Sequence, residues 1–431
     1  MIRWILKGIL RDKSRSIFPG VVVSLGVGLT IVMLGFMDGV LMDMVDMTAN
    51  LDTGHIRFVN KDFYKDEHMN PLDRSLPAQQ ETLKWLRSNS PEQIEWVPRI
   101  RWGAVMDVPD EKGETRAQKP VIGTALDLLS DTSNEFERLG LKKAIIEGRT
   151  PQKPKEIIVG YLAARELQLK VGETITLLGQ SYDGGLAADN YTVVGFVRFG
   201  VNAMDKRMAL MDITGAQDSF YLDDMVTDWL GFLPKDVPYK DYGKIKSDLE
   251  KQLENFKVLP GWAEDDWPVV KTVLEQRNLG TFVTTFENVN FYVVTIFLIL
   301  MGIILWNAGL LNGIYRYGEL GMRLAMGESH GLLLRNLIIE AFLVGIIGSL
   351  FGCALGGSFL YYFQEYGIDM GDKLAQTGLM LSDVSRARVG MDAFIYAVIP
   401  GVLANVLGTL VAGIGIFKRS ESELFRELEH G

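Results

Sequence analysis

The stretch Ile17–Met37, IFPGVVVSLGVGLTIVMLGFM, contains 21 consecutive residues without a charged side chain. A helix of about 20 residues, rising about 1.5 Å per residue, crosses the roughly 30 Å hydrocarbon core of a bilayer. Three later stretches are also free of charge: Asn288–Tyr315, Ala341–Gln364 and Ala393–Phe417. Buried helices of one large soluble core are the alternative, but four runs of this length favour membrane spans. The sequence therefore predicts four transmembrane helices.

The composition combines two kinds of segment. The 431 residues are 48% apolar and 23% charged, with a net charge of -10 and a mean hydropathy of +0.12. Between the first two predicted spans, Leu41–Thr285 carries 39 acidic and 30 basic residues, which accounts for nearly all the net charge. This acidity argues against a nucleic-acid binder, because phosphates require a basic surface. The lone Cys353 has no partner for a disulfide, and a 245-residue segment can bury a core without one.

Basic residues near the helix ends predict the orientation. Eleven lie before the first span, between the second and third, or after the fourth, against three between the third and fourth. The eleven are Arg3, Lys7, Arg11, Lys13, Arg15, Arg316, Arg323, Arg335, Lys418, Arg419 and Arg426, and the three are Lys373, Arg386 and Arg388. Cytoplasmic loops retain Lys and Arg, so both termini are expected inside and Leu41–Thr285 outside.

The first span resembles a signal peptide in its basic lead and apolar middle. Leu34–Asp38 offers no small-x-small cleavage site, so we interpret the span as a permanent anchor. The apolar and basic faces of residues 1–16 suit a helix lying on the inner membrane surface. The predicted order is an interfacial helix 1–16, transmembrane helices 17–40, 286–315, 332–364 and 393–417, an extracytoplasmic domain 41–285, a cytoplasmic helix 316–331, an extracytoplasmic loop 365–392 and a cytoplasmic tail 418–431.

The extracytoplasmic segment is predicted to be mixed α+β. Period-2 apolar patterns predict strands and a Lys-, Glu- and Leu-rich pattern predicts a helix. The expected strands are Glu156–Gly160, Thr174–Leu178 and Tyr191–Val197, and the expected helices are Tyr161–Leu169 and Lys240–Phe256. Gln180–Asn190, which contains Gly184 and Gly185, is predicted to be an exposed loop.

Catalytic patterns are missing from the sequence. It contains no phosphate-binding loop, no nucleophile elbow and no H-E-x-x-H pair. The four histidines are scattered over both predicted sides of the membrane, and carboxylates such as Asp223 and Asp265 are more simply a solvated surface. We therefore expect no catalytic residue, no metal site and no enzyme activity in this chain.

The segment between the second and third spans is the most informative. It reads RYGELGMRLAMGESH from Arg316 to His330. Glu319 and Arg323 have the favourable order for an i,i+4 ion pair, and Gly327 and Ser329 provide a break and a helix cap. By these residues alone, a solvated helical connector is the simplest interpretation.

The spacing E-x-G-x-x-x-A-x-G-x-S over Glu319–Ser329, followed by Glu340 and by glycines at 345, 348, 352 and 356, resembles the FtsX-like permease family. That family includes the MacB and LolC/LolE proteins. Further similar segments are Glu147–Pro151, Ile158–Gly160, Leu162–Ala163, Leu169–Glu173, Val193–Gly195, Trp262, Trp267 and Val273–Asn278, and the last three most resemble the LolC/LolE branch. The resemblance implies an ABC transporter permease in the bacterial inner membrane, with a periplasmic domain between spans 1 and 2.

The resemblance also implies partners. This chain has no fused ATPase domain, so a separate ATPase pair would bind ATP and Mg and dock on the cytoplasmic helix. The permease would pair with a second copy or a related permease and contact membrane lipids. A periplasmic chaperone or adaptor would be a further partner. The implied ATPase-coupling residues are Arg316, Glu319, Gly321, Arg323, Gly327, Glu328 and Ser329. The short Gln180–Asn190 segment lacks the proline-bearing hook that one LolC-type subunit uses on its chaperone.

Two further sets of membrane residues receive roles. Gly348, Gly352 and Gly356 recur every four residues, which predicts close helix packing. Glu340 is expected within the third span, with Arg335 as its partner rather than in a transport role. The resemblance places acyl-chain entry between spans 1 and 2, and so nominates Met33, Phe36, Met37, Phe291, Ile296 and Leu300 as substrate-cavity residues.

Three functions remain open at this point. The first is ATP-driven extraction of lipoproteins or other lipid-linked substrates from the inner membrane. The second is MacB-like efflux of periplasmic substrates through a tripartite system. The third is FtsX-like signalling to a cell-wall hydrolase, for which the 245-residue outer domain is large.

Overall fold

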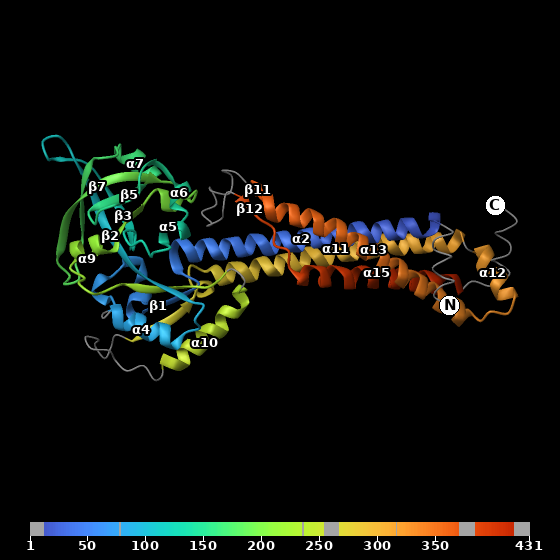
Figure 1. The fold of residues 1–431 in the computed structure, drawn as a ribbon. Helices are drawn as coiled ribbons and strands as arrows, with labels where there is room; N and C mark the ends of the chain where they lie inside the picture. Colours follow the sequence, from blue (N-terminus) through green and yellow to red (C-terminus); the bar gives the residue numbers. More distant parts are fainter. Residues whose placement is uncertain are drawn as a thin grey trace. The chain divides into compact units, whose positions relative to one another are not determined.

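The computed structural model describes residues 13–76, 79–234, 237–253, 267–315, 317–369 and 384–417. The predicted interfacial helix up to residue 12, the tail 418–431 and Trp262 lie outside these ranges. The chain divides into two compact units, which we call the membrane unit and the sheet unit (Figure 1). The membrane unit comprises Met1–Leu41, Thr284–Ile368 and Ser385–Gly431, and the sheet unit comprises Met42–Val283 and Asp369–Val384.

Long helices form the membrane unit. They are α2 (Lys13–Thr48), α11 (Leu279–Tyr315), α13 (His330–Tyr366) and α15 (Met391–Phe417), with the short α12 (Tyr317–Ala325) between α11 and α13. A two-stranded sheet of β11 (Ile368–Asp369) and β12 (Val384–Ser385) lies between α13 and α15 in sequence. Among the described residues, four helices are long and apolar enough to cross a membrane. The predicted four-span fold class is confirmed.

Helix α2 and helix α11 are longer than their charge-free runs. Helix α2 continues to Thr48, past Asp38, Asp43 and Asp46, and α11 begins at Leu279, before Glu287. The charges end the apolar run but do not end the helix, because none of these flanking residues is a proline that would interrupt the backbone hydrogen bonds. Charge-free length therefore underestimates both helices.

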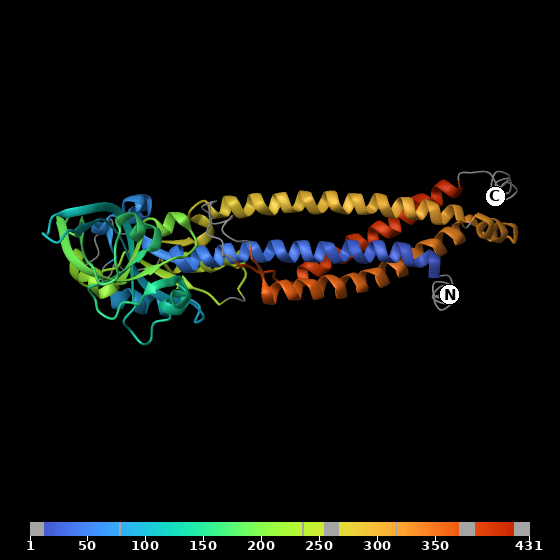
Figure 2. The same ribbon diagram turned by 90° about the horizontal axis from the view of Figure 1, so that it is seen from above.

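Apolar side chains hold α2 at the centre of the membrane unit. Val23, Val27 and Ile31 are buried in one cluster with Met301 of α11 and Leu360 of α13. Figure 2 shows α11 on one side of α2 and the C-terminal half of α13 on the other. Helix α2 thus connects α11 to the rest of the unit.

A ten-stranded sheet forms the sheet unit. Its strands are β1 (Ile56–Asn60), β2 (Glu95–Pro109), β3 (Thr115–Leu126), β4 (Ile145–Gly148), β5 (Glu156–Gly160), β6 (Thr174–Gln180), β7 (Leu186–Val197), β8 (Met208–Asp212), β9 (Asp228–Phe232) and β10 (Pro268–Thr272). The order is β10-β1-β9-β2-β3-β8-β5-β7-β4, and β6 pairs with β2 and β7. The long strand β2 pairs with three partners and links the two halves of the sheet (Figure 1).

Short helices complete the sheet unit. They are α3 (Lys61–Lys65), α4 (Gln79–Asn89), α5 (Glu135–Arg138), α6 (Leu141–Ala144), α7 (Tyr161–Leu167), α8 (Asn202–Asp205), α9 (Ile213–Phe220) and α10 (Tyr242–Leu253). Single 3-10 turns are η2 (Glu67–Met69), η3 (Leu72–Arg74), η4 (Tyr239–Asp241) and η5 (Val273–Glu275), and η1 (Ala49–Thr53) is a π-helical turn directly after α2. A π-turn is rare and frequently marks a functional position.

The predicted strands and helices of this unit are confirmed, with small differences at their ends. The prediction of a loop over Gln180–Asn190 is wrong. Strands β6 and β7 pair in register from Thr174↔Thr192 to Gln180↔Leu186, so only residues 181–185 form the turn. In β7 the side chains alternate: Leu186, Ala188 and Asn190 are exposed, whereas Ala187 and Tyr191 are buried and Asp189, on their side, is half-buried. The polar Asp189 and Asn190 made this strand resemble a loop in sequence.

Candidate functional site

The cytoplasmic helix predicted from sequence is α12, and it ends as expected. Gly327 has a φ of +92°, a left-handed conformation that favours glycine and stops the helix. Ser329 is the N-cap residue of α13, where its carbonyl accepts from the Leu332 and Leu333 amides; its hydroxyl makes no capping bond. Arg316 and the side chain of Glu319 lie outside the described residues, so the Glu319–Arg323 pair stays a prediction.

Two methionines that sequence reading passed over form an apolar surface on and just after α12. Met322 and Met326 lie one turn apart and are 62% and 77% exposed. Among the described residues, a Cβ added at the neighbouring Gly321 would meet no atom within 4 Å. Methionine side chains are flexible and adapt to irregular apolar surfaces. The helix thus presents an adaptable apolar surface beside the predicted polar contacts.

The glycines of α13 face α2. A Cβ added at Gly348 would lie 2.8 Å from the Gly20 carbonyl oxygen, and one at Gly352 would lie 2.7 Å from that of Ser24. At Gly356 the distance to the Gly28 carbonyl oxygen would be 2.6 Å. Each is shorter than an ordinary van der Waals contact, so only glycine permits this backbone approach.

The six nominated substrate residues do not share one environment. Met33, Phe36 and Met37 on α2 are half-buried, and Phe36 packs against the cluster around Met301. The α11 residues Phe291, Ile296 and Leu300 are all more than half exposed. They belong to a longer exposed apolar surface of α11: Val289, Phe291, Tyr292, Val293, Ile296, Ile299, Leu300, Ile303, Ile304 and Trp306.

Helix α13 also carries Glu340, which is half-buried, and Arg335, which is exposed. Their pairing stays a prediction. Beside Glu340, the Ala341 carbonyl accepts a hydrogen bond of 2.6 Å from the Asn405 side-chain amide of α15. This bond joins α13 and α15 next to Glu340 and gives the Asn405 amide a partner, which matters because an unpaired amide would be costly in lipid.

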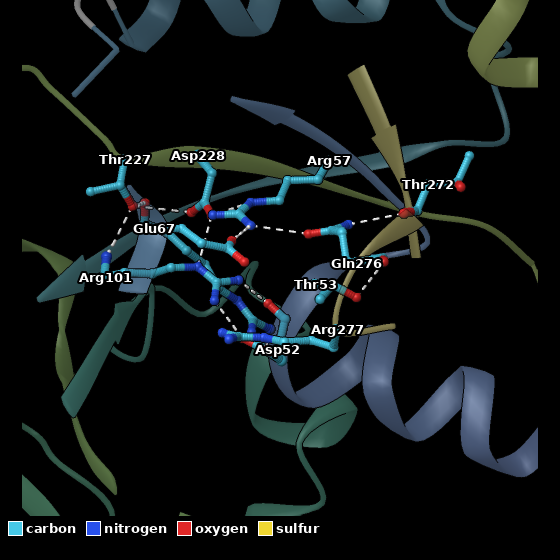
Figure 3. A network of polar contacts seen from close by, with 12 residues as sticks. Asp52, Thr53, Arg57, Glu67, Arg101, Thr227, Asp228, Thr272, Gln276 and Arg277 are labelled. Atoms are coloured by element: carbon cyan, nitrogen blue, oxygen red, sulfur yellow. Dashed lines mark hydrogen bonds and ion pairs between the residues drawn. The ribbon is translucent and has the colours of Figure 1, made fainter. Parts of the chain in front are cut away.

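A buried network of charges in the sheet unit was not predicted (Figure 3). Its centre is Asp228 on β9, which accepts from Arg57 Nε on β1 at 2.7 Å and from Arg101 Nε on β2 at 2.8 Å. Arg57 also donates to Glu67 at 2.7 Å and to the Gln276 side chain at 3.0 Å. Burial alone would raise the pKa of Asp228, but the two guanidinium groups outweigh it and hold that pKa below its usual range.

The same network holds the π-turn η1. Arg101 donates to both the carboxylate and the carbonyl of Asp52, and Arg277 Nε donates to the Asp52 carboxylate at 3.0 Å. Arg99 Nη2 donates to the Asn50 carbonyl at 3.1 Å. The last carbonyls of a helix lack partners within it, and cations are favoured near them. Arginines from β2 and from the segment before α11 therefore fix the end of the helix that starts as span 1.

The network also joins the two segments by which the chain enters and leaves the sheet unit. Strands β1 and β10 pair antiparallel, and the Val273 amide donates to the His55 carbonyl at 3.0 Å. His55 itself is buried, its Nδ1 accepting from the Leu233 amide at 3.0 Å. Arg57 and Asp228 are 171 residues apart in sequence, so no local spacing signals this network.

The described residues show no arrangement of side chains typical of a catalytic site. Within the described residues, no three His, Cys, Asp or Glu side chains form a group able to hold a metal ion. The charged network pairs its acids and bases with one another, which leaves them positioned for structure rather than proton transfer. The candidate functional surfaces are therefore α12 and the exposed surface of α11. The buried charges around Asp52 and Asp228, which we call the Asp52 network, hold the structure together.

Two family models match the chain. Residues 21–233 match the MacB-like periplasmic core domain, and residues 291–420 match the FtsX-like permease C-terminal domain. No curated protein matches.

Among solved structures, the crystal structure of the periplasmic region of MacB from Actinobacillus actinomycetemcomitans is similar to this chain at 12% identity, with a TM-score of 0.34. The match covers 56% of this chain and 96% of that one. The two family models together cover the four apolar helices and most of the sheet unit in the expected order. This chain is a membrane-embedded permease of the FtsX/MacB-type ABC transporter family.

Proposed function

We propose that this permease extracts lipoproteins or other lipid-linked substrates from the inner membrane, using a separate ATPase subunit that binds ATP and Mg. In this proposal both termini are cytoplasmic and the sheet unit is periplasmic. The permease works as a pair, with a second copy or a related subunit, and passes its substrate to a periplasmic chaperone or adaptor.

The observation that supports extraction from the membrane is the exposed apolar surface of α11. Ten apolar side chains between Val289 and Trp306 are between 44% and 67% exposed, while Met301 is buried against α2 at Gly26. A substrate with acyl chains can pack its apolar area on such a surface. The same surface suits the second permease, so substrate and partner would share it.

The test places a photocrosslinking amino acid at Phe291 or Ile296 in native membranes. The proposal expects capture of acylated proteins or lipids, and less capture when acylation is blocked. Position Met301, on the same helix but 4% exposed, is the matched control and should capture neither. Capture only of soluble periplasmic substrates would favour MacB-like efflux, and capture of a cell-wall hydrolase regulator would favour FtsX-like signalling.

Coupling to the ATPase is supported by the surface of α12. The exposed Met322 and Met326 suit an apolar groove in a partner, and the predicted polar residues lie close to them in sequence: Arg316, Glu319, Arg323, Glu328 and Ser329. We expect Met322→Ser with Met326→Ser, and charge reversal at both Glu319 and Arg323, to abolish stimulation of the ATPase by the permease. Met391→Ser is the control, because Met391 is 80% exposed at the start of α15, away from α12 in sequence. Normal stimulation in both α12 variants would refute the docking assignment.

A further inference from the structure

A short break separates the 3-10 turn η5 from α11, the helix that becomes span 2. The sequence at this break contains no residue that requires one. The 3-10 turn η5 ends at Glu275 and α11 begins at Leu279, so three residues, QRN, separate them. Gln and Arg are good helix formers, Asn is a weaker one, and neither proline nor glycine lies between η5 and α11. Helix propensity alone therefore does not require the break, and contacts made by the folded chain contribute to it.

The backbone of the break is unfavourable for Arg277 and less so for Asn278, because asparagine adopts the left-handed conformation more readily than most residues. Gln276 is extended, with φ -109° and ψ 151°, and the next two residues, Arg277 and Asn278, are left-handed, with φ of 52° and 58°. Two consecutive non-glycine residues in this conformation are rare, because Cβ approaches the following carbonyl oxygen. The conformational preferences of these residues alone would favour a right-handed backbone.

Contacts with the Asp52 network oppose that preference. The buried Gln276 side chain accepts from Arg57 at 3.0 Å and donates to the Thr272 carbonyl at 3.2 Å. Arg277 donates to Asp52 at 3.0 Å, at the end of the π-turn η1 (Figure 3). These contacts hold the two residues out of the helix. The break thus depends on side-chain partners that are far away in sequence.

Close packing of the first turn of α11 follows from the same break. A Cβ added at Gly280 would lie 2.5 Å from the Leu274 carbonyl oxygen of η5. Only glycine therefore allows α11 to start against η5 in this way. An alanine at this position would disfavour the interrupted form without touching any charged group.

We propose that residues 276–278 are a two-state joint: latched by Gln276 and Arg277 they interrupt the helix, and released they continue it from η5 into α11. The latched state is the one in this structure. Release exchanges the contacts to Arg57 and Asp52 for helical hydrogen bonds and a right-handed backbone. The joint is a property of the folded chain and does not depend on which substrate is transported.

The experiment measures amide hydrogen exchange of the full-length chain in lipid nanodiscs. In Asn278→Ala the left-handed state is disfavoured and the helix favoured, and Gly280→Ala acts in the same direction through packing. We expect amides 276–280 to exchange at least about fivefold more slowly in the variant that combines Asn278→Ala with Gly280→Ala, because these residues become helical. Arg277→Gln, which removes the contact to Asp52, should slow the same amides.

Two controls separate the joint from general destabilisation. Asn278→Gly tolerates the left-handed conformation and should leave exchange of these amides unslowed. Arg116→Gln removes a comparable ion pair, 3.0 Å to Glu173, elsewhere in the sheet unit and should change nothing at 276–280. If the double alanine variant and Arg277→Gln leave exchange at 276–280 unchanged or make it faster, the break is a fixed structural feature and the proposal is overturned.

Discussion

Replacing Gly356 by alanine tests the contact between α13 and α2 most directly. The added Cβ would lie 2.6 Å from the Gly28 carbonyl oxygen and 2.8 Å from its Cα. Ordinary contacts begin near 3.4 Å, so the two helices must separate by about 0.8 Å at this point. Both colliding atoms are backbone, and neither can rotate away.

The cost follows from the lost contacts along the interface. A gap of 0.5–1 Å forfeits a quarter to a half of each affected dispersion contact, and overpacking of a close interface typically costs about 1–3 kcal/mol. Alanine also stabilises a helix relative to glycine by about 1 kcal/mol. Over most of the range of about 1–3 kcal/mol, the cost of overpacking exceeds this gain in helix stability. We therefore expect a net loss of stability in Gly356→Ala.

The neighbouring glycine provides the matched control. A Cβ at Gly357 would lie 3.4 Å from the Phe394 ring, at the start of the ordinary contact range, and one at Gly302 would meet nothing within 4 Å among the described residues. Both substitutions keep the helix-propensity gain without the clash. Thermal unfolding of the detergent-solubilised chain, followed by size-exclusion chromatography, should rank Gly356→Ala below wild type and both controls at or above it. Equal midpoints for Gly356→Ala and Gly357→Ala would refute the packing argument.

Two further predictions concern buried carboxylates in the sheet unit. Glu135→Gln leaves Arg99 and Arg138 without their buried anion, which accepts from Arg99 at 2.7 Å, and should lower the free energy of unfolding by about 3–5 kcal/mol in urea titrations. Glu156 accepts from Arg149, whose hydrogen bond lowers the pKa of the carboxyl from 4.5 to about 2. A carboxyl whose pKa is lowered by folding stabilises the fold at pH values above its pKa in the unfolded chain. This contribution is therefore complete above pH 4.5 and is lost as the pH falls towards 2. Glu156→Gln should remove that part of the acid dependence.

Controls for these predictions come from exposed pairs. Glu173→Gln removes a partly exposed partner of Arg116 and should cost less than about 1 kcal/mol. If Glu135→Gln lowers the free energy of unfolding as little as Glu173→Gln does, Arg99 has found another partner or water, and the predicted cost of Glu135→Gln is wrong. For Glu156, an unchanged slope of stability against pH between 4.5 and 2 would contradict the assigned role of Arg149.

Local patterns predicted the elements and much of the membrane architecture. Runs such as Ile17–Met37 reveal spans because lipid excludes charge over the whole length of a helix. The strand Glu156–Gly160 and the break at Gly327 were also predictable, since each depends on residues within a few positions. The Gln180–Asn190 error arose from the same source, because polar residues on an exposed strand and in a loop have similar local sequences.

By itself, the sequence determined how many helices cross the membrane, which segment lies between them and which family spacing the α12 segment carries. Each of these depends on neighbours in the chain. Tertiary structure alone decided that Asp52, Arg57, Arg101, Asp228 and Arg277 form one network and that it breaks the helix before span 2. The physical reason is that buried charges must be paired, and in this fold their partners come from strands, a turn and a connecting segment that are far apart in sequence.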